Sequence, residues 1–210
     1  MQTMPRRFRT LSLVALLLSS LVGLVSAAEA MGLGALDEQR RRIDENAERV
    51  ALFADPEVMR AMALAQVSAL EGMKGPRGLV LGALAVACAF AFASAARLAG
   101  KGDVPRENLR RILSGSLLAA AFLRTAEGAM WAVVTQRMGR AAAPLVARPE
   151  LDKEAAALVV EAFPTLMVIV TGVHTAAVAG AFLLLSQYFR SEKVKQLVTL
   201  EDERLGHRRE

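Results

Sequence analysis

Apolar residues along this chain are gathered into four long blocks instead of recurring at the spacing of a soluble core. The blocks cover about residues 11–27, 78–99, 112–135 and 156–189. Each approaches or exceeds the roughly 18 residues that indicate a membrane-crossing helix. Because a backbone in hydrocarbon is satisfied only within helices or closed barrels, the blocks predict an all-α, polytopic membrane protein.

The first block has the layout of a secretory signal. Three arginines precede its apolar run, and small residues follow the run at Ala28 and Ala30. This layout predicts a signal peptide over residues 1–28, cleaved after Ala28 or after Ala30. The alternative is an uncleaved anchor that stays as a fourth span. Both interpretations place residue 29 on the far side of the membrane.

Residues 29–77 form a polar segment that predicts a periplasmic helical hairpin. Apolar residues recur at helical spacing over 36–50. A second helix is expected to begin at the Asp-Pro-Glu sequence of 55–57 and to stop at the glycines and proline of 72–76. The hairpin either docks on a partner or on the membrane surface, or its two helices bury their apolar faces against each other.

The other three blocks predict three transmembrane helices over about 78–99, 112–135 and 156–189. Drawn as one helix, the last block measures about 45 Å against a hydrocarbon thickness of about 30 Å, so a bend at Pro164 is expected. Residues 190–210 form a charged tail with a short amphipathic stretch, predicted to lie on the membrane surface.

Basic residues in the connector 100–111 and in the tail suggest that both are cytoplasmic. The opposite loop, about 136–154, is also basic, so the orientation rests mainly on the signal-like N-terminus. A bacterial inner membrane is the expected location.

Charge and chemistry narrow the function classes. The net charge is +5, but the basic residues sit at span edges and in the tail, so membrane phosphates are the expected counter-charge and no nucleic acid partner is predicted. A single cysteine, Cys88, excludes a disulfide within the chain. The two histidines, His174 and His207, are far apart, and no catalytic motif or set of metal ligands accompanies them. We expect no metal, no cofactor and no enzymatic activity.

Two opposite charges stand near the middle of the third block, and an ionised side chain in hydrocarbon is costly. Arg124 and Glu127 are three residues apart, so they share a helix face and can neutralise each other. His174 lies near the centre of the last block, at a similar depth if the two helices are antiparallel. These three residues are the candidate intramembrane polar cluster. The alternative is a packing ion pair with a hydrogen-bonded histidine.

A stripe of small residues marks the last block. Gly172, Ala176 and Gly180 are spaced by four, which lets one helix backbone approach another closely. The stripe predicts a helix-packing face.

Alanines alternate along residues 83–95, a polar loop with Pro105 follows, and the next helix, SGSLLAAAFLRTAEGAMWAVV, alternates small and apolar residues. In these features the segment 83–134 resembles the helical hairpin of the rotary ATP synthase c subunit. The carboxylate position of that family falls on or beside Arg124, with Glu127 one turn later. The resemblance implies a ring of copies in which Glu127 alternates between protonated and paired states.

Two functions follow as expectations. In the first, the chain is a non-enzymatic assembly or scaffolding protein that associates with copies of itself or with a membrane complex, and Arg124 with Glu127 sets register. In the second, it is an ion- or proton-translocating subunit in which Glu127 titrates and Arg124 modulates it.

Overall fold

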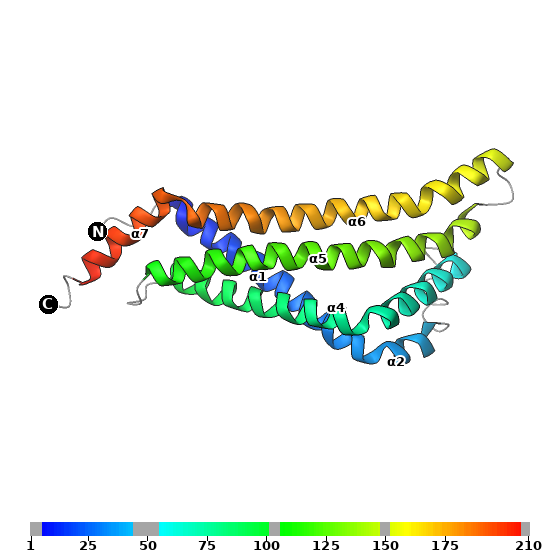
Figure 1. Cartoon of the computed structure of the whole chain (residues 1–210), viewed down its shortest axis with the longest axis horizontal. Helices are drawn as coiled ribbons and strands as arrows, with labels where there is room; N and C mark the ends of the chain where they lie inside the picture. Colours follow the sequence, from blue (N-terminus) through cyan, green and yellow to red (C-terminus); the bar gives the residue numbers. More distant parts are fainter. Residues whose placement is uncertain (1–5, 44–54, 101–105, 148–151, 207–210) are drawn as a thin grey trace. The chain divides into compact units, whose positions relative to one another are not determined.

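The structure is a computed structural model that describes residues 6–43, 55–100, 106–147 and 152–206. Every secondary-structure element in these ranges is helical, which confirms the all-α prediction (Figure 1). The elements are α1 (Arg6–Gly32), a 3-10 turn (Leu33–Ala35), α2 (Leu36–Arg41), α4 (Pro56–Ala99), α5 (Arg106–Val146), α6 (Lys153–Arg190) and α7 (Glu192–Gly206).

Four helical stretches in the described residues are long and apolar enough to cross a membrane. Three of them are α4, α5 and α6, which contain the three predicted spans. The fourth, Arg6–Arg41, includes the predicted signal peptide, and α1 continues as a helix through both predicted cleavage positions to Gly32. A multi-pass membrane protein is therefore supported, and cleavage of the signal stays a prediction.

Helix α4 begins where the sequence indicates but does not stop where it was expected to. The Asp55 carboxylate accepts a 2.9 Å hydrogen bond from the Glu57 N–H, which confirms the predicted cap. The predicted stop over residues 72–76 is wrong, because α4 runs unbroken through Pro76 to Ala99. Helices tolerate such a proline where tertiary contacts hold the neighbouring turns. Here Arg77, the next residue, is buried.

The loop predicted at 136–154 is also shorter than expected. Helix α5 extends through Pro144 to Val146, and α6 starts at Lys153. The Asp152 carboxylate caps α6 by accepting a 2.7 Å hydrogen bond from the Ala155 N–H. Helix α6 then continues through Pro164, where the expected bend stays a prediction.

Some predictions fall outside the described residues. These include the second half of the first hairpin helix (44–50), Pro105 of the c-subunit-like loop, and His207. Within the described part of that hairpin, Leu36 and Ile43 are buried as the helical spacing predicts.

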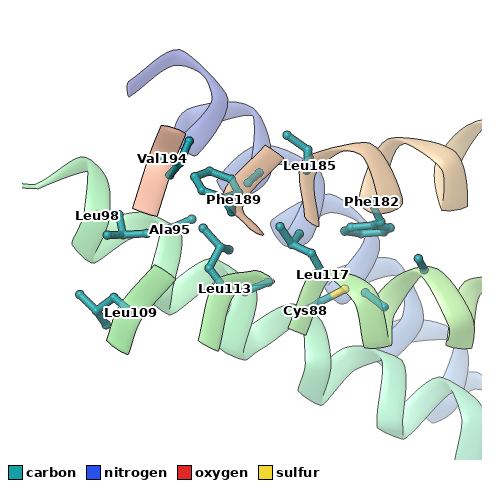
Figure 2. Packing of buried hydrophobic residues seen from close by; sticks show 14 of the residues in the cluster. Cys88, Ala95, Leu98, Leu109, Leu113, Leu117, Phe182, Leu185, Phe189 and Val194 are labelled. Carbon is teal, nitrogen blue, oxygen red and sulfur yellow. The ribbon is translucent and has the colours of Figure 1, made fainter. Parts of the chain in front are cut away.

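The chain divides into two compact units. The first combines Met1–Ala28, Leu81–Thr125 and Ala177–Glu210, and the second combines Glu29–Val80 and Ala126–Ala176. An apolar cluster with contributions from α1, α4, α5, α6 and α7 forms the core of the first unit (Figure 2). Its larger members include Phe8, Leu84, Leu98, Leu113, Leu117, Phe182, Leu185 and Phe189.

Helix α1 contributes a seam of mostly small residues to this first unit. Its buried positions follow each other at spacings of four, three, four and seven, and several larger residues elsewhere on the helix, such as Leu17 and Leu24, are exposed. Gly23 marks a close approach to α4, since a Cβ placed there would lie 2.9 Å from the Cys88 Cβ. The buried positions are Phe8, Ser12, Ala15, Ser19 and Ser26.

Helix α7 packs into the first unit instead of lying wholly on a surface. Val194 and Val198 are buried in its core, whereas Leu197 and Leu200 of the same predicted stripe are exposed. The Asp202 carboxylate caps α5 by accepting hydrogen bonds from the backbone N–H groups of residues 106 and 107, at 2.9 and 3.0 Å. The tail prediction is therefore correct for the helix and wrong for half of its apolar face.

Candidate functional site

The second unit holds a buried charged cluster centred on Arg77 of α4. The Arg77 side chain is 2% exposed and the Glu127 side chain is 0% exposed, whereas Glu29 is 34% exposed. Nη2 of Arg77 donates a 2.6 Å hydrogen bond to Glu29 Oε2 and a 3.0 Å hydrogen bond to Glu127 Oε1. One guanidinium thus joins carboxylates from α1 and α5 through α4. Charge-assisted bonds of this kind are short and strong.

Trp131 completes the cluster. It follows Glu127 by one turn of α5, and the Arg77 Cζ lies 4.6 Å from the centroid of its ring. A cation over an indole face is stabilised by the ring quadrupole, more so when water is excluded. Nη1 of Arg77 is buried and has no hydrogen-bond partner among the described residues. The Arg77 guanidinium is therefore held by two carboxylates at Nη2 and by the Trp131 ring at its face.

Close helix packing surrounds the cluster. A Cβ at Gly128, next to Glu127, would collide with the Thr175 side chain of α6. A Cβ at Gly139 would lie 2.7 Å from the Pro164 Cα, so α5 and α6 also approach closely there. These two glycines are the positions in the second unit where a side chain would separate the helices.

The three residues of the predicted cluster have different surroundings in the structure. Glu127 is buried beside Arg77, and Arg124 lies one turn earlier on α5 and is half-buried. Pairing of Arg124 with Glu127 stays a prediction. His174 is exposed on α6, although the next residue, Thr175, is buried against Gly128.

The small-residue stripe faces outward within the chain. Gly172 and Ala176 are exposed and Gly180 is half-buried, and no described atom lies within 4 Å of a Cβ placed at either glycine. Within the second unit, α6 and α5 approach closely at Gly128 and Gly139. The packing role of the stripe stays a prediction.

The charged cluster joins residues that stand at the ends of two apolar blocks of the sequence. Glu29 follows the apolar run of α1, and Arg77 immediately precedes the apolar block of α4. Glu29 and Glu127 both bind Arg77, so the buried carboxylate of α5 is joined through Arg77 to the ends of these two blocks. The depth of Arg124 and Glu127 in the membrane stays a prediction.

Sequence reasoning missed Arg77, Glu29 and Trp131. Both charges were assigned to the aqueous segment 29–77, because α4 was expected to end at Pro76. One signal was present: Trp131, the sole tryptophan, shares a helix face with Glu127 four residues earlier.

Neither family models, nor curated proteins, nor solved structures give a match to this chain. The resemblance to the c subunit therefore stays a prediction. Among the described residues, no group of three or more His, Cys, Asp or Glu side chains is arranged to hold a metal ion.

Proposed function

We propose that the chain is a non-enzymatic, multi-pass protein of a bacterial inner membrane that acts in the assembly or scaffolding of a membrane complex. One observation supports this proposal most directly: the buried Arg77 joins carboxylates from two other helices and lies over Trp131. An ion pair of this kind is weak evidence for stability, because desolvation offsets the attraction. Its best-attested use is to specify register and partner choice.

Helix α1 has a structural role in this proposal. Its small-residue seam is buried, and Glu29, beyond the predicted cleavage position at Ala28, binds Arg77. We therefore favour retention of α1 as the first of four spans. An even number of spans puts both termini on the same side, and the arginines before the first apolar run favour the cytoplasm. The edge-to-face contact of Phe8 with Phe189, at 5.8 Å, agrees with this arrangement.

The test of the assembly role is replacement of Arg77 and Glu127 together by Met and Leu, which keeps apolar volume but removes both charges. We expect the complex that co-purifies with the protein, measured by native mass spectrometry, to be lost or to change in stoichiometry. The Glu127→Gln variant is the matched control, because the amide still accepts a hydrogen bond from Arg77. An unchanged complex in the double variant would count against the proposal.

The second candidate function is ion or proton movement through Glu127. The exposed fraction of the side chain falls from Glu29 through Arg77 to Glu127. This observation favours transport, because the contacts among the three residues connect the surface to a buried carboxylate. Reconstituted liposomes separate the two candidates. Flux that is abolished by Glu127→Gln, with assembly intact, supports transport; absence of Glu127-dependent flux overturns it.

A further inference from the structure

The residues Ala28-Glu29-Ala30 match a signal-peptidase site in sequence but lie inside a helix. Two small residues on either side of a third, after an apolar run, are the pattern that directs cleavage after the second small residue, here Ala30. We call these three residues the processing motif. A peptidase binds its substrate as an extended strand. Because α1 continues as a helix to Gly32, the motif must unwind before its backbone can be cut.

The carboxylate in the middle of the processing motif is bound to α4. Oε2 of Glu29 accepts a 2.6 Å hydrogen bond from Arg77 Nη2, the shorter of the two hydrogen bonds that this nitrogen donates to carboxylates. Arg77 is itself fixed in place, because its side chain is 2% exposed and also binds Glu127. Unwinding of the motif therefore has to break a short, charge-assisted hydrogen bond to a buried cation.

Residues after the motif also hold the chain against α4. Leu33 is 5% exposed, and its Cδ1 lies 3.9 Å from a Cβ placed at Gly78. Further along, Arg40 of α2 and Glu71 of α4 are 3.3 Å apart, but both of these side chains are partly or largely exposed. Exposed ion pairs contribute little to stability. The Glu29 pair with Arg77 is therefore the polar contact that most opposes unwinding of the motif.

We propose that the processing motif is a signal-peptidase site that the Glu29–Arg77 pair protects in the folded chain. Hydrolysis there breaks the bond between the carbonyl carbon of Ala30 and the nitrogen of Met31. Water supplies a hydroxyl group to Ala30 and a proton to the new amine of Met31. Glu29 leaves with the excised segment, so processing also takes one carboxylate away from Arg77. The inference deepens the retention of α1 proposed above and rests on it.

The test adds purified bacterial signal peptidase to the full-length protein in detergent micelles and follows the mass and the N-terminal sequence over time. Cleavage of a site that opens only transiently follows the population of the open form. Glu29→Ala removes the bond to Arg77 and leaves the bond between Arg77 and Glu127 in place. We expect this variant to be processed about tenfold faster than the wild type, with Met31 as the new N-terminus.

Three further variants separate protection of the motif from general loss of stability. Arg77→Met/Glu127→Leu removes the bond without changing the motif, keeps the buried positions apolar, and should be processed as fast as Glu29→Ala. Glu71→Gln is the matched control, because it removes the exposed pair between α2 and α4, and it should be processed at the wild-type rate. Ala28→Leu, added to Glu29→Ala, should abolish processing, because it replaces a small residue of the motif by a large one.

Several outcomes would overturn the proposal. Wild-type protein that is cut as fast as the Glu29→Ala variant would show that the pair gives no protection. A Glu29→Ala variant that stays intact, or that is cut elsewhere than before Met31, would show that the motif is not the site. Extracted wild-type protein that already begins at Glu29 or Met31 would overturn both the protection and the retention of α1.

Failure of this proposal and failure of the assembly role give different results. An Arg77→Met/Glu127→Leu variant that resists the peptidase but loses its co-purifying complex overturns only the protection of the motif. A double variant that is processed while its complex stays unchanged overturns the role assigned to the charged cluster.

Discussion

Arg77 of α4 donates a 3.0 Å hydrogen bond to Glu127 of α5, and both side chains are almost completely buried. The pair joins residues 50 positions apart in the chain, and Glu29 adds a third helix through the same nitrogen atom. A buried pair is costly to break one side at a time, because the remaining charge is left without compensation. Replacing one partner of the pair should therefore cost more free energy of unfolding than replacing both, and this difference can be measured.

The Glu127→Leu variant should be destabilised by about 3–5 kcal/mol in free energy of unfolding, because it removes a carboxylate from the buried guanidinium. The Arg77→Met/Glu127→Leu double variant should recover much of that loss. Denaturant titration in micelles, arranged as a double-mutant cycle, measures the coupling. Near-additive losses would show that the two side chains do not act as a pair.

An exposed ion pair of the same chain provides the control for this cycle. Arg42 and Glu38 are 2.7 Å apart, but both side chains are largely exposed. Exposed pairs contribute at most about 1 kcal/mol, so Glu38→Gln should leave the unfolding curve almost unchanged.

Helix packing beside the cluster yields a second prediction. Gly128→Ala introduces a methyl group where Thr175 already lies, so it should cost about 1–3 kcal/mol through overpacking. Gly115→Ala, on the same helix, meets no described atom within 4 Å and should cost nothing. Thermal unfolding in detergent compares the two variants. Equal melting temperatures would mean that α5 and α6 do not approach closely at Gly128.

The helices illustrate what sequence could and could not predict. The cap at Asp55 and the apolar blocks depend on local residues, so the start of α4 and the all-α class were readable. Helix α4 continues through Pro76, and the next residue, Arg77, contacts residues 48 and 50 positions away, which no local pattern contains. For the same reason, the sequence showed Glu127 to be a costly charge, but it assigned Arg77, the partner of Glu127 in the structure, to an aqueous segment.

The docking of α7 gives a third prediction. Asp202→Ala removes the carboxylate that caps the first turn of α5, a loss typically worth about 1 kcal/mol. Amide hydrogen exchange at Arg106 and Glu107 should then speed up about fivefold. Thr199→Ala, exposed on the same helix, should leave exchange unchanged. Unaltered exchange in the Asp202 variant would show that α7 does not cap α5 in solution.

Retention of α1 is the last prediction, and Gly23 is the residue that tests it. The intact extracted protein should have the full mass of 22.5 kDa. Cleavage after Ala28 would remove the seam of small residues by which α1 packs within the first unit. A Gly23→Leu substitution should lower stability, because even a Cβ at this position lies 2.9 Å from the Cys88 Cβ. Leu21→Ile is the control, because Leu21 is exposed on the same helix. If the signal is removed, neither substitution is present in the mature protein, so a lighter mass with identical stability in both variants would refute retention.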